Sequence, residues 1–135
     1  MRLMLVALLL AVMSGAGCSR YPQERQALID FFEAARLRDT TVLGNMGTAT
    51  FEPRTDGIVQ QFDIDRVEAM PPRMENGKAI EAKHGILNAQ VRTPDGEIVP
   101  ERLDVMFERP VGGRWLITQL RASRTSRAAS SAPPN

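Results

Sequence analysis

The chain has 135 residues, of which 43% are hydrophobic, 24% charged and 5% aromatic. This length suits a single domain and excludes a multidomain enzyme, and a formal net charge of +1 argues against a nucleic-acid-binding protein. The single cysteine excludes an internal disulfide framework and a metal site built on paired cysteines. A Gly-rich phosphate loop and zinc-ligand spacing are also missing from the sequence, so we predict neither a metal nor a cofactor.

The first seventeen residues have the pattern of a secretory signal peptide. Arg2 gives a positive start, an unbroken apolar run covers residues 3–13, and small residues fill positions 14–17. A helix over that apolar run would span roughly 16 Å, about half of a bilayer's hydrocarbon core. We therefore predict a signal peptide over residues 1–17 rather than a membrane-spanning helix.

The only cysteine follows this segment directly, in the order Gly15, Ala16, Gly17, Cys18. This order resembles the lipobox of bacterial lipoproteins, with Gly15 in place of the usual leucine. The resemblance implies that Cys18 is lipidated with a diacylglyceryl thioether and is acylated at its new amino group. Such chains anchor a protein stably, because each buried methylene contributes about 0.8 kcal/mol. The alternatives are an ordinary secreted protein with an incidental cysteine and an uncleaved anchor.

The same resemblance suggests where the mature protein would lie. Lipoproteins of this kind are anchored in the bacterial cell envelope and face the periplasm, and Ser19 after the cysteine favours the outer membrane over the inner one. We predict a lipidated tether over residues 18–23 and one domain over residues 24–123. Residues 124–135, rich in Ser, Ala and Pro and without an acidic residue, are expected to be a disordered tail.

Two helices are expected at the start of the domain. Leu28, Phe31, Phe32 and Ala35 fall at the i, i+3, i+4, i+7 spacing of one helical face, which predicts a helix from about Pro22 to Arg38. The charged residues of this segment, among them Glu24, are expected on the other faces. Asp39 is a candidate N-cap for a short second helix over residues 40–45, which Gly47 would end.

Four strands follow, over residues 58–68, 79–91, 97–109 and 114–123. Pro71 and Pro72 are expected to interrupt the chain after the first strand. In the second strand the apolar residues change parity between Ala82 and Leu87, which predicts a β-bulge at Gly85. The sequence thus predicts an α+β domain, in which the N-terminal helix and the short second helix pack on a curved four-stranded antiparallel sheet.

This order of elements resembles the nuclear transport factor 2-like superfamily, which is also grouped as cystatin-like. The matching features are Phe31 and Phe32 in an early helix, the break at Arg38-Asp39, and a long sheet that ends in residues 115–117. The resemblance implies a helix lying against a curved sheet. The superfamily holds isomerases, dehydratases, ligand carriers and non-catalytic lipoproteins, so membership does not fix a function.

Four residues are candidates for lining a cavity between helix and sheet: Phe31, Phe32, His84 and Trp115. His84 is the only histidine, and it is a candidate general base because histidine as a residue type can exchange protons near neutral pH. Glu81, three residues away on a strand, lies on the opposite face and cannot orient it. Trp115 is a candidate for stacking on an apolar ligand. The alternative for both is a structural role in the sheet.

Two further clusters are candidate chemical sites. Asp63 and Asp65 share one face of a strand, as an acid–base pair or a cation site would require, but this face points away from the apolar residues. Met70 and Met74 with His84 form the outline of a copper site without a methionine-repeat motif. Solvated carboxylates and packing methionines are the alternatives.

These observations lead to one main functional hypothesis and two rivals. The main one is a non-catalytic lipoprotein, anchored in the membrane through Cys18, that binds an envelope protein or serves as an accessory subunit of an envelope assembly. The first rival is a carrier of a small apolar ligand in the cavity of the sheet. The second is a small isomerase or hydrolase that uses His84 and a carboxylate.

Overall fold

The computed structural model describes residues 20–123. The elements are the helices α1 (Pro22–Leu37) and α2 (Thr40–Met46) and the strands β1 (Ile58–Glu75), β2 (Lys78–Arg92), β3 (Ile98–Pro110) and β4 (Leu116–Ala122). Two helices and a four-stranded antiparallel sheet make an α+β domain, as predicted. The predicted signal peptide, Cys18 and the predicted tail lie outside the described residues. Because α1 begins at Pro22, it takes in the last two residues of the predicted tether.

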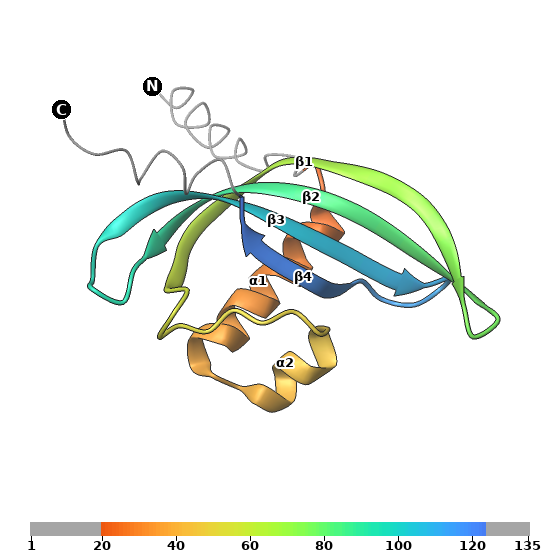
Figure 1. Cartoon of the computed structure of the whole chain (residues 1–135), viewed down its shortest axis with the longest axis horizontal. Helices are drawn as coiled ribbons and strands as arrows, with labels where there is room; N and C mark the ends of the chain where they lie inside the picture. Colours follow the sequence, from red (N-terminus) through yellow and green to blue (C-terminus); the bar gives the residue numbers. More distant parts are fainter. Residues whose placement is uncertain (1–19, 124–135) are drawn as a thin grey trace, which may run out of the picture.

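The sheet is a simple antiparallel meander in which each strand pairs with the next along the chain, in the order β1-β2-β3-β4. Figure 1 shows the strands bending over α1, which lies on the concave side of the sheet, with α2 on the same side and further from the strands. We call this concave side the inner face of the sheet and the opposite side the outer face. Both helices therefore leave the outer face uncovered.

The core lies between α1 and the inner face. Leu28 and Phe31 of α1 and Leu87, Leu103 and Phe107 of the sheet are all 0% exposed. In the middle of β3 and along β2 from Leu87 to Arg92 the buried residues alternate with more exposed ones, which is the pattern of a sheet that buries one face. The aromatic rings of the helix extend this core, since Phe32 makes an edge-to-face contact with Phe31 at a centroid distance of 5.8 Å.

The break between the helices is formed as the sequence predicts. Arg38 adopts the left-handed conformation, with φ 56°, and its backbone N–H caps the last turn of α1. The carboxylate of Asp39 then accepts a hydrogen bond of 3.0 Å from the backbone N–H of Val42, so Asp39 is the N-cap of α2. Gly47 ends α2, and a Cβ at this position would lie 2.0 Å from the carbonyl oxygen of Ile117. Only glycine allows this close approach to β4.

The prediction that Pro71 and Pro72 interrupt the chain is wrong. β1 continues through both prolines to Glu75, and its register with β2 shifts between Met70 and Arg73. The prolines are tolerated because β1 is an edge strand, where an N–H is not needed on the open side, and because they lie in an irregularity of the ladder. The first hairpin is therefore longer than predicted.

The predicted bulge at Gly85 is also wrong. β2 and β3 pair in an unbroken register through Gly85, and the nearby shift lies instead in β1, between Ile64 and Arg66. The odd-numbered residues of β2 face inward along the whole strand, so Ile80 and Ala82 lie on the outer face. Gly85 is required for a different reason, because a Cβ there would lie 2.9 Å from Cγ1 of Val105.

Within residues 20–123, neither helix has the length and apolar character needed to cross a membrane.

Candidate functional site

The four predicted cavity residues do not lie together. Phe31 and Phe32 are buried in the core, 0% and 8% exposed, and Trp115 is 8% exposed at the inner face. His84 lies on the outer face, because its neighbours along β2 are Lys83, which contacts Trp115, and Gly85, which faces the core. His84 therefore cannot share a cavity with the three aromatic residues.

His84 does have an acidic partner that sequence spacing could not reveal. Its Nε2 lies 3.2 Å from Oδ1 of Asp104, on the neighbouring strand β3, and the two side chains are 32% and 29% exposed. The strand register explains the contact, since His84 pairs with Met106 and Asp104 lies two residues away on the same face. This is a partly hydrated surface pair, without the enclosure that a general base usually needs to act on a bound substrate.

Trp115 is covered on the inner face by two cations. The Nζ of Lys83 lies 4.6 Å from the ring centroid, and the guanidinium carbon of Arg109 lies 4.3 Å from it. Both distances allow cation–π attraction. The indole N–H of Trp115 is buried without a hydrogen-bond partner among the described residues. The two cations take the place where an apolar ligand would stack.

Each of these cations is held by a carboxylate. Lys83 Nζ donates a hydrogen bond of 2.7 Å to Oε1 of Glu24, in the first turn of α1. Arg109 Nε donates to Glu81, which lies opposite it in the register of β2 and β3. Glu24 is only 5% exposed, so the expectation that it lies on a polar face of the helix is wrong. The sequence does contain an indication of this burial, because Glu24 precedes Leu28 by four residues and therefore lies on the same face of the helix.

The candidate carboxylates and methionines are spread over the sheet. Asp63 and Asp65 are exposed, as predicted, and Asp65 accepts a hydrogen bond of 2.8 Å from Arg102. Met74 lies opposite Ala79, which is about 16 Å along β2 from His84, so Met70, Met74 and His84 do not converge. Within residues 20–123, no group of three or more His, Cys, Asp or Glu side chains is placed to hold a metal ion.

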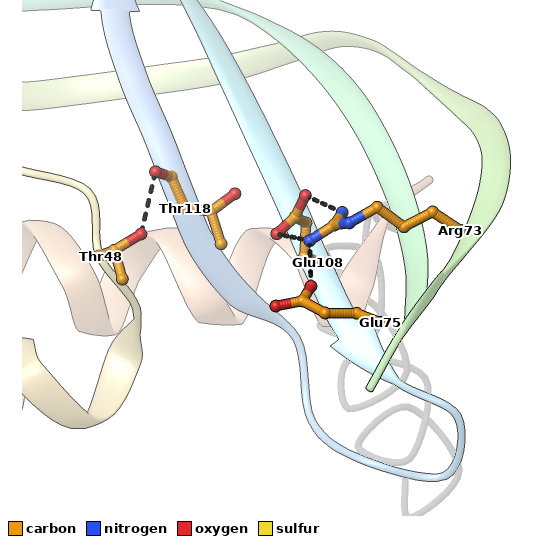
Figure 2. A network of polar contacts seen from close by, with 5 residues as sticks. All are labelled: Thr48, Arg73, Glu75, Glu108 and Thr118. Carbon is orange, nitrogen blue, oxygen red and sulfur yellow. Dashed lines mark hydrogen bonds and ion pairs between the residues drawn. The ribbon is translucent and has the colours of Figure 1, made fainter. Parts of the chain in front are cut away.

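The outer face carries a cross-strand ion pair that spans β2. Arg73 of β1 donates to both carboxylate oxygens of Glu108 on β3, and its Nη2 also donates to Glu75 at 3.0 Å (Figure 2). Hydrogen bonds to these two carboxylates raise the pKa of the Arg73 guanidinium, Glu108 contributing most. The pair holds the long first hairpin against the rest of the sheet. Figure 2 also shows Thr48 donating to the carbonyl oxygen of Thr118, which joins the segment after α2 to β4.

A hollow of about 630 Å³ lies at one end of the sheet, between the segment after α2 and the ends of β3 and β4. Its lining includes the charged residues Asp56, Glu101, Asp104 and Arg121. None of the four predicted cavity residues lines this hollow. Its volume is that of a small-molecule site, but its charged lining does not suit the apolar ligand of the carrier hypothesis.

The other notable feature is a group of exposed apolar side chains at the far end of the first hairpin. Met70, Met74 and Val111 are 42%, 70% and 65% exposed. Met74 lies opposite Ala79 in the register, and the backbone N–H of Val111 donates to the carbonyl oxygen of the same Ala79. Met74 and Val111 therefore flank one point of β2. Met70 instead pairs with Ala82 and lies on the outer face. We call Met74 and Val111 the apolar arm.

Comparison with known proteins gives no match: no protein family, no curated protein and no solved structure shows significant similarity to this chain.

Proposed function

We propose that this protein is a lipoprotein of the bacterial cell envelope, anchored in the outer membrane through lipid at Cys18 and facing the periplasm. On this proposal its domain is nuclear transport factor 2-like, does no catalysis, and binds another envelope protein. The order of one helix, a short helix and a four-stranded meander is consistent with that superfamily. The signal pattern of residues 1–17 and the position of Cys18 support the anchor.

The single observation that best supports a binding role is the extent of sheet that the helices leave uncovered. α1 has 16 residues and spans about 24 Å, whereas β1 has 18 residues and spans about 60 Å. The apolar arm lies on the part of the hairpin furthest along these strands. Exposed apolar side chains are typical of protein contact sites, and the ion pair of Arg73 with Glu108 holds this end of the hairpin from the outer face.

The distance between anchor and domain fits work close to the membrane. Three residues lie between Cys18 and Pro22, where α1 begins, and the four steps from one Cα to the next reach at most about 14 Å. A domain held this closely searches a small volume, which raises its effective concentration toward other proteins of the same membrane. A partner in the envelope would therefore be met more often than a soluble one.

Catalysis is the weaker hypothesis because the residues able to perform it are dispersed. His84 and Asp104 form an open surface pair, and the carboxylates of the inner face are neutralised by Lys83 and Arg109. An acid–base mechanism needs such groups within reach of one bound substrate. The described residues offer no place where they converge.

Membrane fractionation of the full-length protein expressed in a bacterium tests the anchor. The wild type and a Ser19→Ala control should pellet with membranes after a high-salt wash, and Cys18→Ala should be released. Retention of Cys18→Ala in the washed membranes would overturn the lipid anchor.

Mass spectrometry of the protein extracted in mild detergent tests the binding role. A stoichiometric envelope protein in the extract is the expected result. A monomer that retains a lipid or small molecule would instead support the carrier, and an empty monomer would count against both binding hypotheses.

A further inference from the structure

A second hollow, about 510 Å³ in volume, lies between the end of α1, the segment that leads into β1, and the turn from β2 to β3. It gathers four arginines from three separate parts of the chain. Its lining consists of Arg36, Arg38, Pro53, Arg54, Ile58, Arg92, Thr93, Pro94 and Gly96. No carboxylate belongs to this lining. In a chain whose formal charge is only +1, four guanidinium groups around one hollow, two of them paired with carboxylates outside its lining, leave a local excess of positive charge. We call it the arginine pocket.

The fold holds these arginines in place through close backbone packing. Gly57 has φ +88°, and a Cβ there would lie 2.5 Å from the carbonyl oxygen of Arg92. The segment that carries Arg54 is thus pressed against the end of β2. Arg38 is fixed by its left-handed conformation at the end of α1. The backbone around the pocket is therefore part of the folded framework, and the four arginine side chains extend from it as exposed groups.

Two of the four arginines are oriented by carboxylates that stand outside the pocket. Arg36 Nη2 lies 2.6 Å from Oε1 of Glu33, and Arg38 Nη2 lies 2.8 Å from Oε1 of Glu52. Each guanidinium has five N–H donors in a planar fork, so one carboxylate leaves donors free for a second anion. The side chain of Arg92 forms no ion pair with any residue in 20–123.

An independent observation also points to a ligand. Thr93 lines the pocket, and its hydroxyl oxygen is buried without a hydrogen-bond partner among residues 20–123. Buried hydroxyl groups in folded proteins are nearly always hydrogen-bonded, because an unpaired one is costly. The hydroxyl oxygen is closed to solvent in this structure, so an oxygen atom of a bound anion would accept from it after a small rotation of the Thr93 side chain. The charged groups and the unpaired hydroxyl therefore favour the same class of ligand.

We propose that the arginine pocket binds a ligand carrying phosphate groups. Arginine recognises phosphate through paired N–H donors, and the volume accommodates more than a single phosphate ion. The phosphate could belong to a soluble molecule or to the headgroup of an anionic lipid. This proposal does not depend on the lipid anchor or on the apolar arm, because it rests on residues at the opposite end of α1 from Pro22.

Calorimetric titration of the full-length protein, in a non-ionic detergent at low ionic strength, tests the proposal. One arm uses sodium pyrophosphate, and the other uses mixed micelles containing phosphatidylglycerol. Saturable binding in the first arm identifies a soluble phosphate ligand, and binding confined to the second identifies a lipid headgroup. Absence of saturable binding in both arms overturns the proposal.

Variants then locate the binding. Arg54→Gln and Arg92→Gln should each weaken binding about tenfold, as expected for loss of a hydrogen bond from a charged group. Arg66→Gln, whose side chain pairs with Glu68 on the sheet, is the matched control and should bind like the wild type. Equal binding by Arg54→Gln, Arg92→Gln and the wild type would show that the anion binds elsewhere and would overturn the assignment.

Thr93→Val separates a ligand contact from a structural defect, because valine has the shape of threonine without the hydroxyl. We expect weaker binding with folding retained, as measured by thermal unfolding without ligand. Unchanged binding by a folded Thr93→Val protein would remove the hydroxyl from the site and contradict that part of the proposal.

Discussion

Lys83 of β2 and Glu24 in the first turn of α1 form the contact that ties the start of the helix to the middle of the sheet. Their Nζ and Oε1 atoms are 2.7 Å apart, and the side chains are 31% and 6% exposed. Lys83 also covers one side of Trp115. A negative side chain in the first turn is further favoured by the helix dipole. The contact closes the core at the end where the sheet runs on past the helix.

Removal of one partner should therefore destabilise the domain. Lys83→Met leaves the buried carboxylate of Glu24 without its charged partner, and we expect a loss of about 1–3 kcal/mol in the free energy of unfolding. Urea unfolding of Lys83→Met, of Glu24→Gln and of the double variant completes a double-mutant cycle. The double variant should lose less than the sum of the two single losses. Strict additivity would show that the two side chains do not interact.

The aromatic residues of α1 should account for much of the core's stability. Phe31→Ala and Phe32→Ala should each cost about 3–5 kcal/mol, because each leaves a cavity between helix and sheet. Ile29→Ala is the control on the same helix, since Ile29 is 41% exposed and surface changes usually stay within about 0.5 kcal/mol. Thermal unfolding measures all three. Equal unfolding temperatures for Phe31→Ala and the wild type would refute the packing described for α1.

Two glycines in ordinary backbone conformations should respond to alanine in opposite ways. At Gly85 a Cβ would lie 2.9 Å from Val105 and 3.0 Å from Phe107, so Gly85→Ala should cost about 1–3 kcal/mol through overpacking. At Gly44, inside α2, a Cβ would meet nothing within 4 Å. Gly44→Ala should therefore stabilise the protein by about 0.5–1 kcal/mol through better helix propensity. The same sign of change for both variants would contradict this account.

Glu52 should contribute to the pH dependence of stability. The hydrogen bond from Arg38 lowers the pKa of this carboxyl, and burial opposes the effect only in part. A lowered pKa in the folded state stabilises the protein above the unfolded value of about 4.3, and this contribution is lost as the pH falls through the folded pKa.

The matching experiment follows unfolding by urea from neutral pH to about pH 3. Glu52→Gln should show a shallower loss of stability in the acid range than the wild type. Glu33→Gln should behave in the same way, because hydrogen bonds from Arg36 lower the pKa of Glu33. Parallel curves for Glu52→Gln and the wild type would mean that the Arg38 contact does not persist in solution.

Local patterns were enough to predict the elements, because each is encoded by near neighbours. The stripe of Leu28, Phe31 and Phe32 predicts α1, and Asp39 predicts the start of α2 at Thr40. The alternation of apolar and polar residues predicts β3. The pattern failed at Pro71 and Pro72 because whether a proline is tolerated depends on the strand's place at the edge of the sheet, which is a property of the whole fold.

The sites depend on contacts between distant residues, so the sequence revealed little of them. His84 meets Asp104 only through the register of β2 and β3, and Glu24 meets Lys83 across 59 residues of chain. The arginine pocket joins positions from Arg36 to Gly96. The alternation of apolar residues in β2 led to the wrong prediction of a bulge, because Ile80 and Ala82 are apolar but lie on the outer face. An apolar residue in a strand does not by itself mark the buried side.

Photo-crosslinking in the native envelope tests the central claim, which is that the apolar arm binds another envelope protein. A benzophenone side chain is placed at position 74 of the full-length protein, and the control carries it at position 30, on the exposed face of α1. We predict one discrete protein adduct from position 74 and none from position 30. Absence of an adduct at position 74, or the same adducts from both positions, would contradict a binding role for the arm.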